Sequence, residues 1–328
     1  MSTPPVVALA ARSLTRRFGD LVAVDEIDLD VRTGSIFGLL GPDGAGKTTL
    51  IRMLATVLDP TDGDAHVLGL SVTHDRAQVT PRIGYMPQRF CMYPDLTIAE
   101  NIDYFATLRG VRRRDRRTRS ARLLESMGLA EFAGMRSGTI SGGMKQKLML
   151  ASTLMHEPDV LLLDEPTTGV DPVSRREFWR LLAGLHREGR TILVATPYMD
   201  EAERCTDIAF LRGGAITIRG TQSDVAARVP GVLLEVGGAA PRDVLGALQA
   251  AHDPRLRSAH LHGDVVRVLW EGPTESSSAS LDSLAVHHDS ATRLVEEIAA
   301  HHGVPGVVAR RLRVDMEAAF AVLAQERA

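Results

Sequence analysis

Apolar and polar residues alternate along residues 24–32, a period of two that predicts a half-exposed antiparallel strand. Three short runs, at residues 36–40, 160–163 and 192–195, contain no polar side chain. Uninterrupted runs of this length between turn-forming residues are typical of strands that are buried on both faces. The pattern therefore predicts a parallel sheet as the centre of an α/β fold.

Helical segments lie between these runs, and two of them are predicted to begin with a capping box. In each box a hydroxyl residue precedes a glutamate by three positions: Thr97 with Glu100, and Ser174 with Glu177. After the first box, apolar residues recur at helical spacing and predict a single apolar stripe, formed by Ile98, Ile102, Phe105 and Leu108.

The pattern changes near residue 222, beyond which glycine-rich motifs give way to a plain alternation of strands and helices. We therefore expect two domains, at residues 6–222 and 223–328. The second is predicted to have strands near 232–236, 258–262, 265–270 and 307–313, and helices near 241–252, 289–302 and 315–326. This order fits a small ferredoxin-like α+β domain. The serine-rich stretch 273–280 reads as an exposed loop within it.

Composition excludes several classes of protein. The formal net charge of -3 gives no overall attraction to nucleic acid or anionic lipid. No apolar run reaches 18 residues and the first residues lack a basic secretory start, so we expect no membrane span and a cytosolic chain. The two cysteines are too few for a disulfide framework or a zinc site.

The glycine-rich segment that follows residues 36–40 has the spacing of a phosphate-binding loop between a strand and a helix. Its glycines let backbone N–H groups surround a polyphosphate, and the helix that starts near Lys47 adds its positive end. Lys47 is one of only three lysines among 38 basic residues, and it is expected to neutralise the β- and γ-phosphates. The predicted nucleotide-binding residues here are Gly41, Pro42, Asp43, Gly44, Ala45, Gly46, Lys47, Thr48 and Thr49.

Two carboxylates, Asp164 and Glu165, follow the run 160–163 and so stand at the end of a buried strand, where open α/β sheets bind ligands. Thr48 and Asp164 are predicted to hold Mg²⁺, the latter through water. Glu165 is placed to polarise the water that attacks the γ-phosphate. An acidic pair could instead merely cap the next helix, but the phosphate loop in the same chain favours the catalytic interpretation.

With these motifs, and with Ser141, Gly142 and Gly143 opening a further helix, the chain resembles the nucleotide-binding subunit of an ATP-binding cassette (ABC) transporter. The resemblance covers about residues 6–222 and points to the exporter-like group whose membrane parts are separate polypeptides. It implies a P-loop NTPase fold, with a RecA-like parallel sheet, an antiparallel β subdomain and a helical subdomain at about residues 90–157. The segment 140–144 is similar to the family signature, which binds the ATP held by the opposite subunit, although Met144 replaces the usual glutamine.

Three more roles come from the resemblance alone. Gln88 matches the glutamine loop, which touches magnesium and transmits motion to the membrane subunit. Asp171 lies in the segment that crosses between the two ATPase subunits. Phe18 occupies the position at which the family stacks an aromatic ring on adenine; considered alone, it is a core or a surface residue with equal chance.

One position departs from the family pattern. After the run 192–195 the family has a histidine that contacts the γ-phosphate, whereas this chain has Pro197. Proline has neither a side-chain donor nor a backbone N–H, so this contact is lost. Three interpretations stay open: slow hydrolysis driven by Glu165, a substitute donor, or a partner subunit with the more competent site.

Two charged features are interpreted as ordinary protein surface. Seven arginines from Arg112 to Arg122 are expected to form a solvated helix face. No aromatic platform accompanies them, which argues against binding of nucleic acid. Contact with the membrane surface is the alternative. The pairs His287–His288 and His301–His302 are expected to be surface residues, because adjacent helical residues point in different directions.

The resemblance thus implies an ATP hydrolase that uses ATP and Mg²⁺, pairs with a second ATPase subunit as a homodimer or heterodimer, and powers export of a small molecule, drug or lipid. Its expected partner is a polytopic membrane subunit, which would hold it at the cytoplasmic face of the membrane; no nucleic acid is expected. A groove near Gln88, Tyr93 and the helix 97–109 would receive that subunit. The alternatives are a soluble ABC ATPase that remodels a ribosome or DNA complex, and a regulatory subunit with little hydrolysis, which Pro197 suggests.

Overall fold

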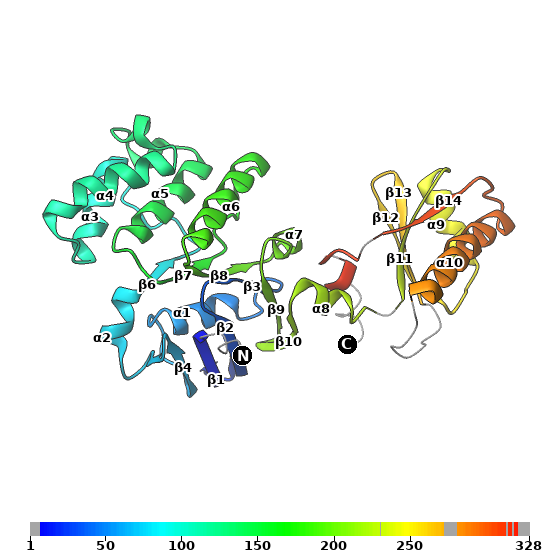
Figure 1. Ribbon diagram of the computed structural model, residues 1–328, viewed down its shortest axis with the longest axis horizontal. Helices are drawn as coiled ribbons and strands as arrows, with labels where there is room; N and C mark the ends of the chain where they lie inside the picture. Colours follow the sequence, from blue (N-terminus) through cyan, green and yellow to red (C-terminus); the bar gives the residue numbers. More distant parts are fainter. Residues whose placement is uncertain (1–6, 230, 272–280, 313, 317, 321–328) are drawn as a thin grey trace. The chain divides into compact units, whose positions relative to one another are not determined.

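The computed structural model describes residues 7–229, 231–271, 281–312, 314–316 and 318–320. The chain divides into two compact units, Met1–Gln222 and Ser223–Ala328, each of which is described by itself (Figure 1). Within the described residues, no helix is both long and apolar enough to cross a membrane.

The first unit is built on a six-stranded sheet. In spatial order its strands are β10 (Ala215–Gly220), β9 (Asp207–Arg212), β3 (Ile36–Leu40), β8 (Thr191–Thr196), β7 (Val160–Asp164) and β6 (Ile83–Met86). All neighbours pair in parallel except β10, which runs antiparallel to β9 at one edge. Every residue of β3, β7 and β8 is buried, which confirms the buried parallel strands predicted from their apolar runs.

A four-stranded antiparallel sheet forms the second layer of this unit. Its strands, in spatial order, are β2 (Leu21–Arg32), β1 (Val7–Phe18), β4 (Asp62–Val67) and β5 (Leu70–Ser71). Buried and exposed residues alternate along the second half of β2, as the alternating sequence predicts. Apolar side chains of both sheets and of helix α1 (Lys47–Leu54) meet in one core, so this core fixes the loop between β3 and α1.

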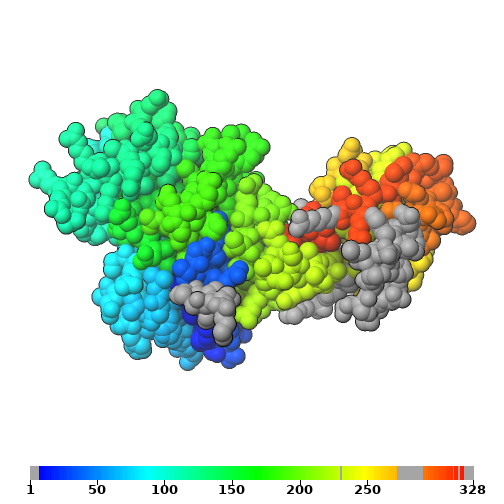
Figure 2. Space-filling view, in the orientation of Figure 1, coloured from blue at the N-terminus to red at the C-terminus, as the bar shows by residue number. Residues whose placement is uncertain are grey.

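Helices α3 (Ile98–Leu108), α4 (Arg113–Ser126) and α5 (Gly142–Leu154) form the helical subdomain, the lobe coloured cyan to green in Figures 1 and 2. The remaining helices of the unit are α2 (Arg76–Val79), α6 (Pro172–Arg187), α7 (Met199–Ala202) and the start of α8 (Gln222–Ala226). Single 3₁₀ turns lie at Thr80–Arg82, Ala130–Phe132 and Ser137–Thr139.

The two predicted capping boxes have different outcomes. At α3 the Thr97 hydroxyl accepts from the backbone N–H of Glu100 while the Glu100 carboxylate accepts from that of Thr97, so this box is confirmed. The box at Ser174 is wrong, because α6 already begins at Pro172 and is capped by the Asp171 carboxylate. Proline at the first helical position and an aspartate before it form the stronger start signal.

The predicted apolar stripe of α3 is only half correct. Ile98 and Ile102 are buried, but Leu108 is 64 % exposed. Asn101 is fully buried instead, because its side chain satisfies backbone groups of the preceding loop, including the N–H of Tyr93 at 2.8 Å. The buried face of α3 thus combines the apolar Ile98 and Ile102 with the hydrogen-bonded Asn101.

The second unit has the predicted order strand, helix, strand, strand, helix, strand. These elements are β11 (Val232–Gly237), α9 (Pro241–Ala250), β12 (Leu256–His262), β13 (Val265–Trp270), α10 (Leu281–His301) and β14 (Val308–Arg311). The antiparallel sheet order β12-β13-β11-β14 is that of a ferredoxin-like fold, as expected. Helix α10 begins earlier than predicted. The predicted loop 273–280 and most of the predicted helix 315–326 lie outside the described residues.

Candidate nucleotide-binding site

The loop between β3 and α1 has a backbone that only glycine tolerates. Gly41 and Gly46 have φ of 151° and 104°, and a Cβ atom on them would lie 2.2 Å from the carbonyl oxygen of Leu211 and 2.3 Å from that of Ala23, respectively. Both positions therefore exclude a side chain on steric grounds as well as by conformation. The glycines let the loop run close to the backbone of Leu211 and Ala23.

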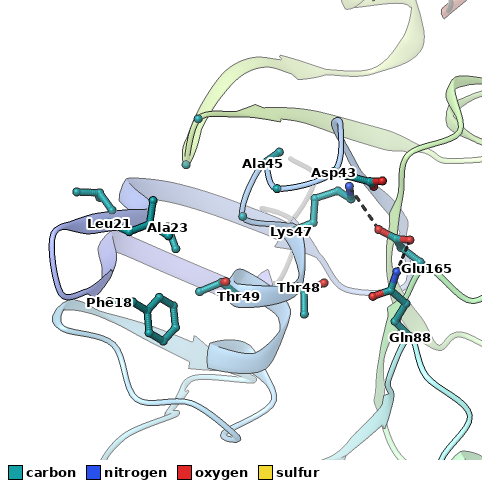
Figure 3. A pocket seen from close by; sticks show the side chains of 15 residues that line it. Phe18, Leu21, Ala23, Asp43, Ala45, Lys47, Thr48, Thr49, Gln88 and Glu165 are labelled. Atoms are coloured by element: carbon teal, nitrogen blue, oxygen red, sulfur yellow. Dashed lines mark hydrogen bonds and ion pairs between the residues drawn. The ribbon is translucent and has the colours of Figure 1, made fainter.

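A cavity of about 470 Å³ lies beside this loop. Figure 3 shows Phe18, Leu21 and Ala23 at its apolar end and Lys47, Gln88 and Glu165 at its polar end. The predicted residues that line it are Phe18, Asp43, Gly44, Ala45, Gly46, Lys47, Thr48, Thr49, Gln88 and Glu165. Five further lining residues were not predicted from the sequence: Leu21, Val22, Ala23, Gly213 and Gly214. Proximity to Phe18 along the hairpin could have indicated the first three, whereas nothing local signalled the glycine pair.

Lys47 is held with its ammonium group inside the loop. Its side chain is 3 % exposed, and Nζ donates to the carbonyl oxygens of Gly41 and Pro42 at 2.8 and 3.0 Å. Nζ also lies 3.5 Å from Oε1 of Glu165. A buried cation whose three donors meet two carbonyls and one carboxylate is positioned to turn toward a polyphosphate that enters the cavity.

Glu165 directly follows β7 and adopts a left-handed backbone conformation with φ of 48°. Its N–H donates to the carbonyl oxygen of Ala195 at 2.9 Å, and its Oε2 accepts from Gln88 Nε2 at 2.8 Å and from the Thr168 hydroxyl at 3.2 Å. Positive φ at a residue that is not glycine is strained and is concentrated at functional sites. Backbone and side chain are thus both fixed at the polar end of the cavity.

Asp164 is the last residue of β7 and is fully buried. Its Oδ1 accepts from the Thr48 hydroxyl at 3.0 Å, while Oδ2 has no hydrogen-bond partner among the residues that the structure describes. Burial raises the pKa of Asp164, and the nearby Glu165 carboxylate acts in the same direction, against the lowering effect of the Thr48 hydrogen bond. An unsatisfied carboxylate oxygen beside a hydroxyl is a donor set that suits Mg²⁺, so the residues fit the predicted ion.

The described residues contain no cluster of three or more His, Cys, Asp or Glu side chains that could hold a metal by themselves. Any cation at Thr48 and Asp164 would therefore need ligands from the nucleotide and water as well. This is the usual way in which Mg²⁺ binds beside phosphates.

Phe18 lies at the apolar end of the cavity and is 45 % exposed. The guanidinium carbon of Arg16 lies 4.6 Å from its ring centroid, a cation–π contact. The ring is thus a surface residue at the rim rather than part of the core, and it is available for stacking.

Gly41 and Pro42 belong to the phosphate loop but do not line the cavity. The same holds for four predicted binding residues elsewhere in the chain: Ser141, Gly142, Gly143 and Asp171. They lie at the N-termini of α5 and α6, where Ser141 Oγ and Asp171 Oδ1 accept from backbone amides of the first turns. A Cβ on Gly143 would lie 2.6 Å from Ser174 Oγ, so the two N-termini pack tightly together. Both N-termini belong to the same unit as the cavity but lie outside its lining.

Pro197 directly follows β8, at the position where the family has a histidine. None of the described residues that line the cavity is a histidine. The next residue, Tyr198, donates its N–H to the Thr196 hydroxyl at 3.1 Å, and its ring lies 4.8 Å from the guanidinium carbon of Arg175. The proline is therefore followed by an ordered turn into α7.

The arginine run is largely paired within the helical subdomain. Arg112 and Arg114 contact Asp115, Arg116 contacts Asp103, and Arg119 and Arg122 both contact Glu157. These ion pairs agree with the solvated helix face that the sequence predicted. His301 and His302 are exposed, and the side chains of His287 and His288 lie outside the described residues.

Comparison with known proteins agrees with this geometry. Residues 24–168 match the family model described as ABC transporter. The chain is 42 % identical over 226 residues to the probable multidrug ABC transporter ATP-binding protein YbhF of Escherichia coli, a match that covers 69 % of this chain but 39 % of that protein. It is 32 % identical over 300 residues to the linearmycin resistance ATP-binding protein LnrL of Bacillus subtilis, which covers 90 % of this chain and 91 % of that one.

A third relative is the daunorubicin resistance ATP-binding protein DrrA3 of Streptomyces coeruleorubidus, 35 % identical over 312 residues, with 89 % of this chain and 99 % of that one covered. Among solved structures, the dimeric structure of MJ0796, a bacterial ABC transporter cassette, matches with a TM-score of 0.60 and 25 % identity; 65 % of this chain and 98 % of that one are covered. The predicted resemblance is confirmed: the chain belongs to the ATP-binding proteins of the ABC transporter family.

Proposed function

We propose that this chain is the ATP-hydrolysing subunit of an exporter whose membrane-spanning part is a separate polypeptide. The observation that carries the proposal is the cluster of Lys47, Gln88 and Glu165 at the polar end of the cavity, linked by contacts of 3.5 and 2.8 Å (Figure 3). The names of the relatives, which refer to multidrug transport, linearmycin resistance and daunorubicin resistance, support export of a small molecule.

In the proposed reaction the loop amides and Lys47 bind the β- and γ-phosphates, and Phe18 stacks on the base. Thr48, Asp164 and Gln88 would hold Mg²⁺, which supplies positive charge that offsets the charge developing on the phosphates. Glu165 accepts a hydrogen bond from a water molecule and orients it toward the γ-phosphate. Gln88, which donates to this carboxylate, keeps it in place until the substrate arrives.

The site is proposed to be completed by a second ATPase subunit, either another copy or a different ABC subunit. Ser141 and Asp171 lie outside the cavity at two helix N-termini, a placement that suits contact with the nucleotide bound by the other subunit. The solved structure of the MJ0796 cassette is dimeric, which supports this arrangement. ATP binding would then favour the closed pair, and hydrolysis would reopen it.

A polytopic membrane subunit is proposed to bind the helical subdomain and so hold the chain at the cytoplasmic face of the membrane. Tyr93 and Tyr104 are exposed and stack edge to face with their centroids 4.9 Å apart. Exposed aromatic rings with a polar tip are typical of protein interfaces. We further propose residues 6–222 as the ATP-binding domain and 223–328 as a domain that regulates or supports pairing.

Two variants test hydrolysis directly. Glu165→Gln removes the carboxylate and Lys47→Ala removes the buried cation; phosphate release should fall by about 10²-fold or more in Glu165→Gln, with ATP binding retained. Lys47→Ala should lose ATP affinity as well. Glu131→Gln, an exposed glutamate of the turn Ala130–Phe132, is the control and should match the wild type.

A test of the proposed export function requires the membrane subunit. Affinity purification of the full chain from detergent-solubilised membranes should recover a polytopic protein that stimulates phosphate release. RNase-sensitive sedimentation with ribosomes, without any membrane partner, would contradict export and favour a soluble remodelling ATPase.

A further inference from the structure

The loop from Glu165 to Asp171 joins β7 to α6 and carries a proposed functional residue at each end. Its backbone is closed by two short-range hydrogen bonds, from Thr168 N to Glu165 O and from Val170 N to Thr167 O, both at 3.2 Å. Because the loop is this tight, a shift at its centre moves both ends.

Two adjacent threonines at the centre of the loop donate their hydroxyl hydrogen bonds to different carboxylates. The Thr168 hydroxyl donates to Glu165 Oε2 at 3.2 Å and so contacts the proposed catalytic carboxylate. The Thr167 hydroxyl donates at 2.6 Å to Oε1 of Glu201, and Thr167 is only 1 % exposed. The centre of the loop is therefore hydrogen-bonded both to Glu165, its own first residue, and to Glu201 outside the loop.

Glu201 lies on α7, the short helix that follows Pro197, and it is 0 % exposed. Its Oε1 binds Thr167, whereas its Oε2 has no hydrogen-bond partner within the described part of the chain. Burial of a carboxylate with incomplete pairing is unfavourable, and an apolar residue of similar volume commonly serves stability as well or better. Stability alone therefore gives no reason for a glutamate here.

We infer that Glu201 is a positioning residue that, through Thr167, holds the loop 165–171 in register with the segment that follows β8. This inference rests on the proposed function, because the loop matters only if Glu165 and Asp171 act on ATP. In the family pattern a histidine stands at the start of that segment, where this chain has Pro197 without a side-chain donor. The Glu201–Thr167 hydrogen bond links the segment to the loop by another route.

The contact should affect the catalytic step more than ATP binding. Neither Glu201 nor Thr167 lines the nucleotide cavity, and the Lys47 ammonium group binds Gly41, Pro42 and Glu165 instead. Loss of the Glu201–Thr167 hydrogen bond would leave the phosphate-binding groups in place but loosen the loop that carries Thr168, and so shift the Glu165 carboxylate to which Thr168 donates. A small misplacement of a reacting group is enough to slow catalysis strongly.

Paired variants of the full-length chain separate positioning from folding. Thr167→Val and Glu201→Met remove the hydrogen bond and nearly keep side-chain volume; Thr167→Ser and Glu201→Gln keep a hydroxyl donor and a carbonyl acceptor. We expect the first pair to lower kcat about tenfold or more with KM for ATP changed less than about twofold. The second pair should restore most of the rate. Glu201→Met should also melt no lower than the wild type, because it removes a buried carboxylate.

Thr206→Val is the control, because it removes a threonine hydrogen bond at an exposed residue four positions after α7, to the carbonyl oxygen of Ile36 at 2.8 Å. Its kcat should stay close to the wild-type value. If Thr167→Val and Glu201→Met kept the wild-type kcat, or lost activity only in proportion to the unfolded fraction, the positioning role would be refuted. A wild-type rate no higher than that of Glu165→Gln would instead overturn the proposed hydrolysis, and this inference with it.

Discussion

Single residues decide the chemistry of the polar end of the cavity, and Pro197 is the one that departs from the family pattern. Lys47, Gln88 and Glu165 occupy the cavity as the motifs predict, and none of the described lining residues is a histidine. A γ-phosphate bound there would lack one donor that the family supplies. Removal of one donor to developing charge costs about 10²-fold or more in rate.

Pro197→His should therefore raise kcat, by up to about 10²-fold, when phosphate release is measured at saturating ATP. Pro197→Ala is the necessary control, because it removes the proline ring without adding an imidazole, and it should leave the rate unchanged. An unchanged rate in both variants would show that another group already serves as the donor.

Residues with a local spacing signal could be proposed from the sequence, whereas residues brought together only by the fold could not. The phosphate loop 41–48 needs only its own glycines, and Asp164–Glu165 only the preceding apolar run. The turn Gly213–Gly214 reaches the cavity because β9 pairs with β3, a contact between segments far apart in the chain. The role proposed for Glu201 likewise depends on its hydrogen bond with Thr167, 34 positions earlier in the chain.

At the scale of the elements, the N-terminus of α3 depends on a titratable group, the Glu100 carboxylate of its capping box. Hydrogen bonds from the backbone N–H and hydroxyl of Thr97 lower the pKa of Glu100. A carboxylate with a depressed pKa stabilises the fold above its unfolded pKa and loses that contribution as the pH falls through its folded pKa. The helix start is therefore weaker in acid.

Glu100→Gln should accordingly be less stable than the wild type at pH 7, with the gap closing as the pH falls below the ordinary value of 4.5. Urea unfolding at a series of pH values measures the gap. Thr97→Ala should lose about 1 kcal/mol at neutral pH, since it removes the N-cap. A gap that widened in acid would contradict the assigned hydrogen bonds.

The close packing of α5 against α6 determines which helical glycines can be replaced by alanine. A Cβ on Gly143 would lie 2.7 Å from Cβ of Ser174, an atom that cannot rotate away, whereas a Cβ on Gly184 in α6 would meet nothing within 4 Å. The same substitution should thus have opposite effects at two helical glycines. The sequence placed Gly143 at a helix start but could not show what packs against it.

Gly184→Ala should raise the free energy of unfolding by about 0.5–1 kcal/mol, the helix-propensity difference. Gly143→Ala should lower it and also weaken ATP-dependent pairing of subunits, because the helices must separate at their N-termini. Chemical unfolding and light scattering with ATP in a Glu165→Gln background provide the two readouts. Equal stability of the two alanine variants would contradict the packing described.

At the scale of the whole molecule, the two units have separate cores, and all the residues that line the nucleotide cavity lie between Phe18 and Gly214. The division follows Gln222, whose Nε2 donates to the carbonyl oxygens of Ala202, Glu203 and Cys205 at 3.3, 2.8 and 3.1 Å. A fragment that ends at Gln222 keeps these bonds. The end of the glycine-rich motifs near residue 222 marks the same place in the sequence.

Residues 1–222 should therefore fold alone and bind ATP within about twofold of the full-length affinity, because no cavity residue is removed. Gln222→Ala in this fragment should cost about 1 kcal/mol or more, since the amide satisfies carbonyl groups beside α7. With Glu165→Gln added, ATP-dependent pairing measured by light scattering should be weaker for the fragment than for the full chain. Pairing as tight as in the full chain would exclude a supporting role of residues 223–328 and leave regulation as their function.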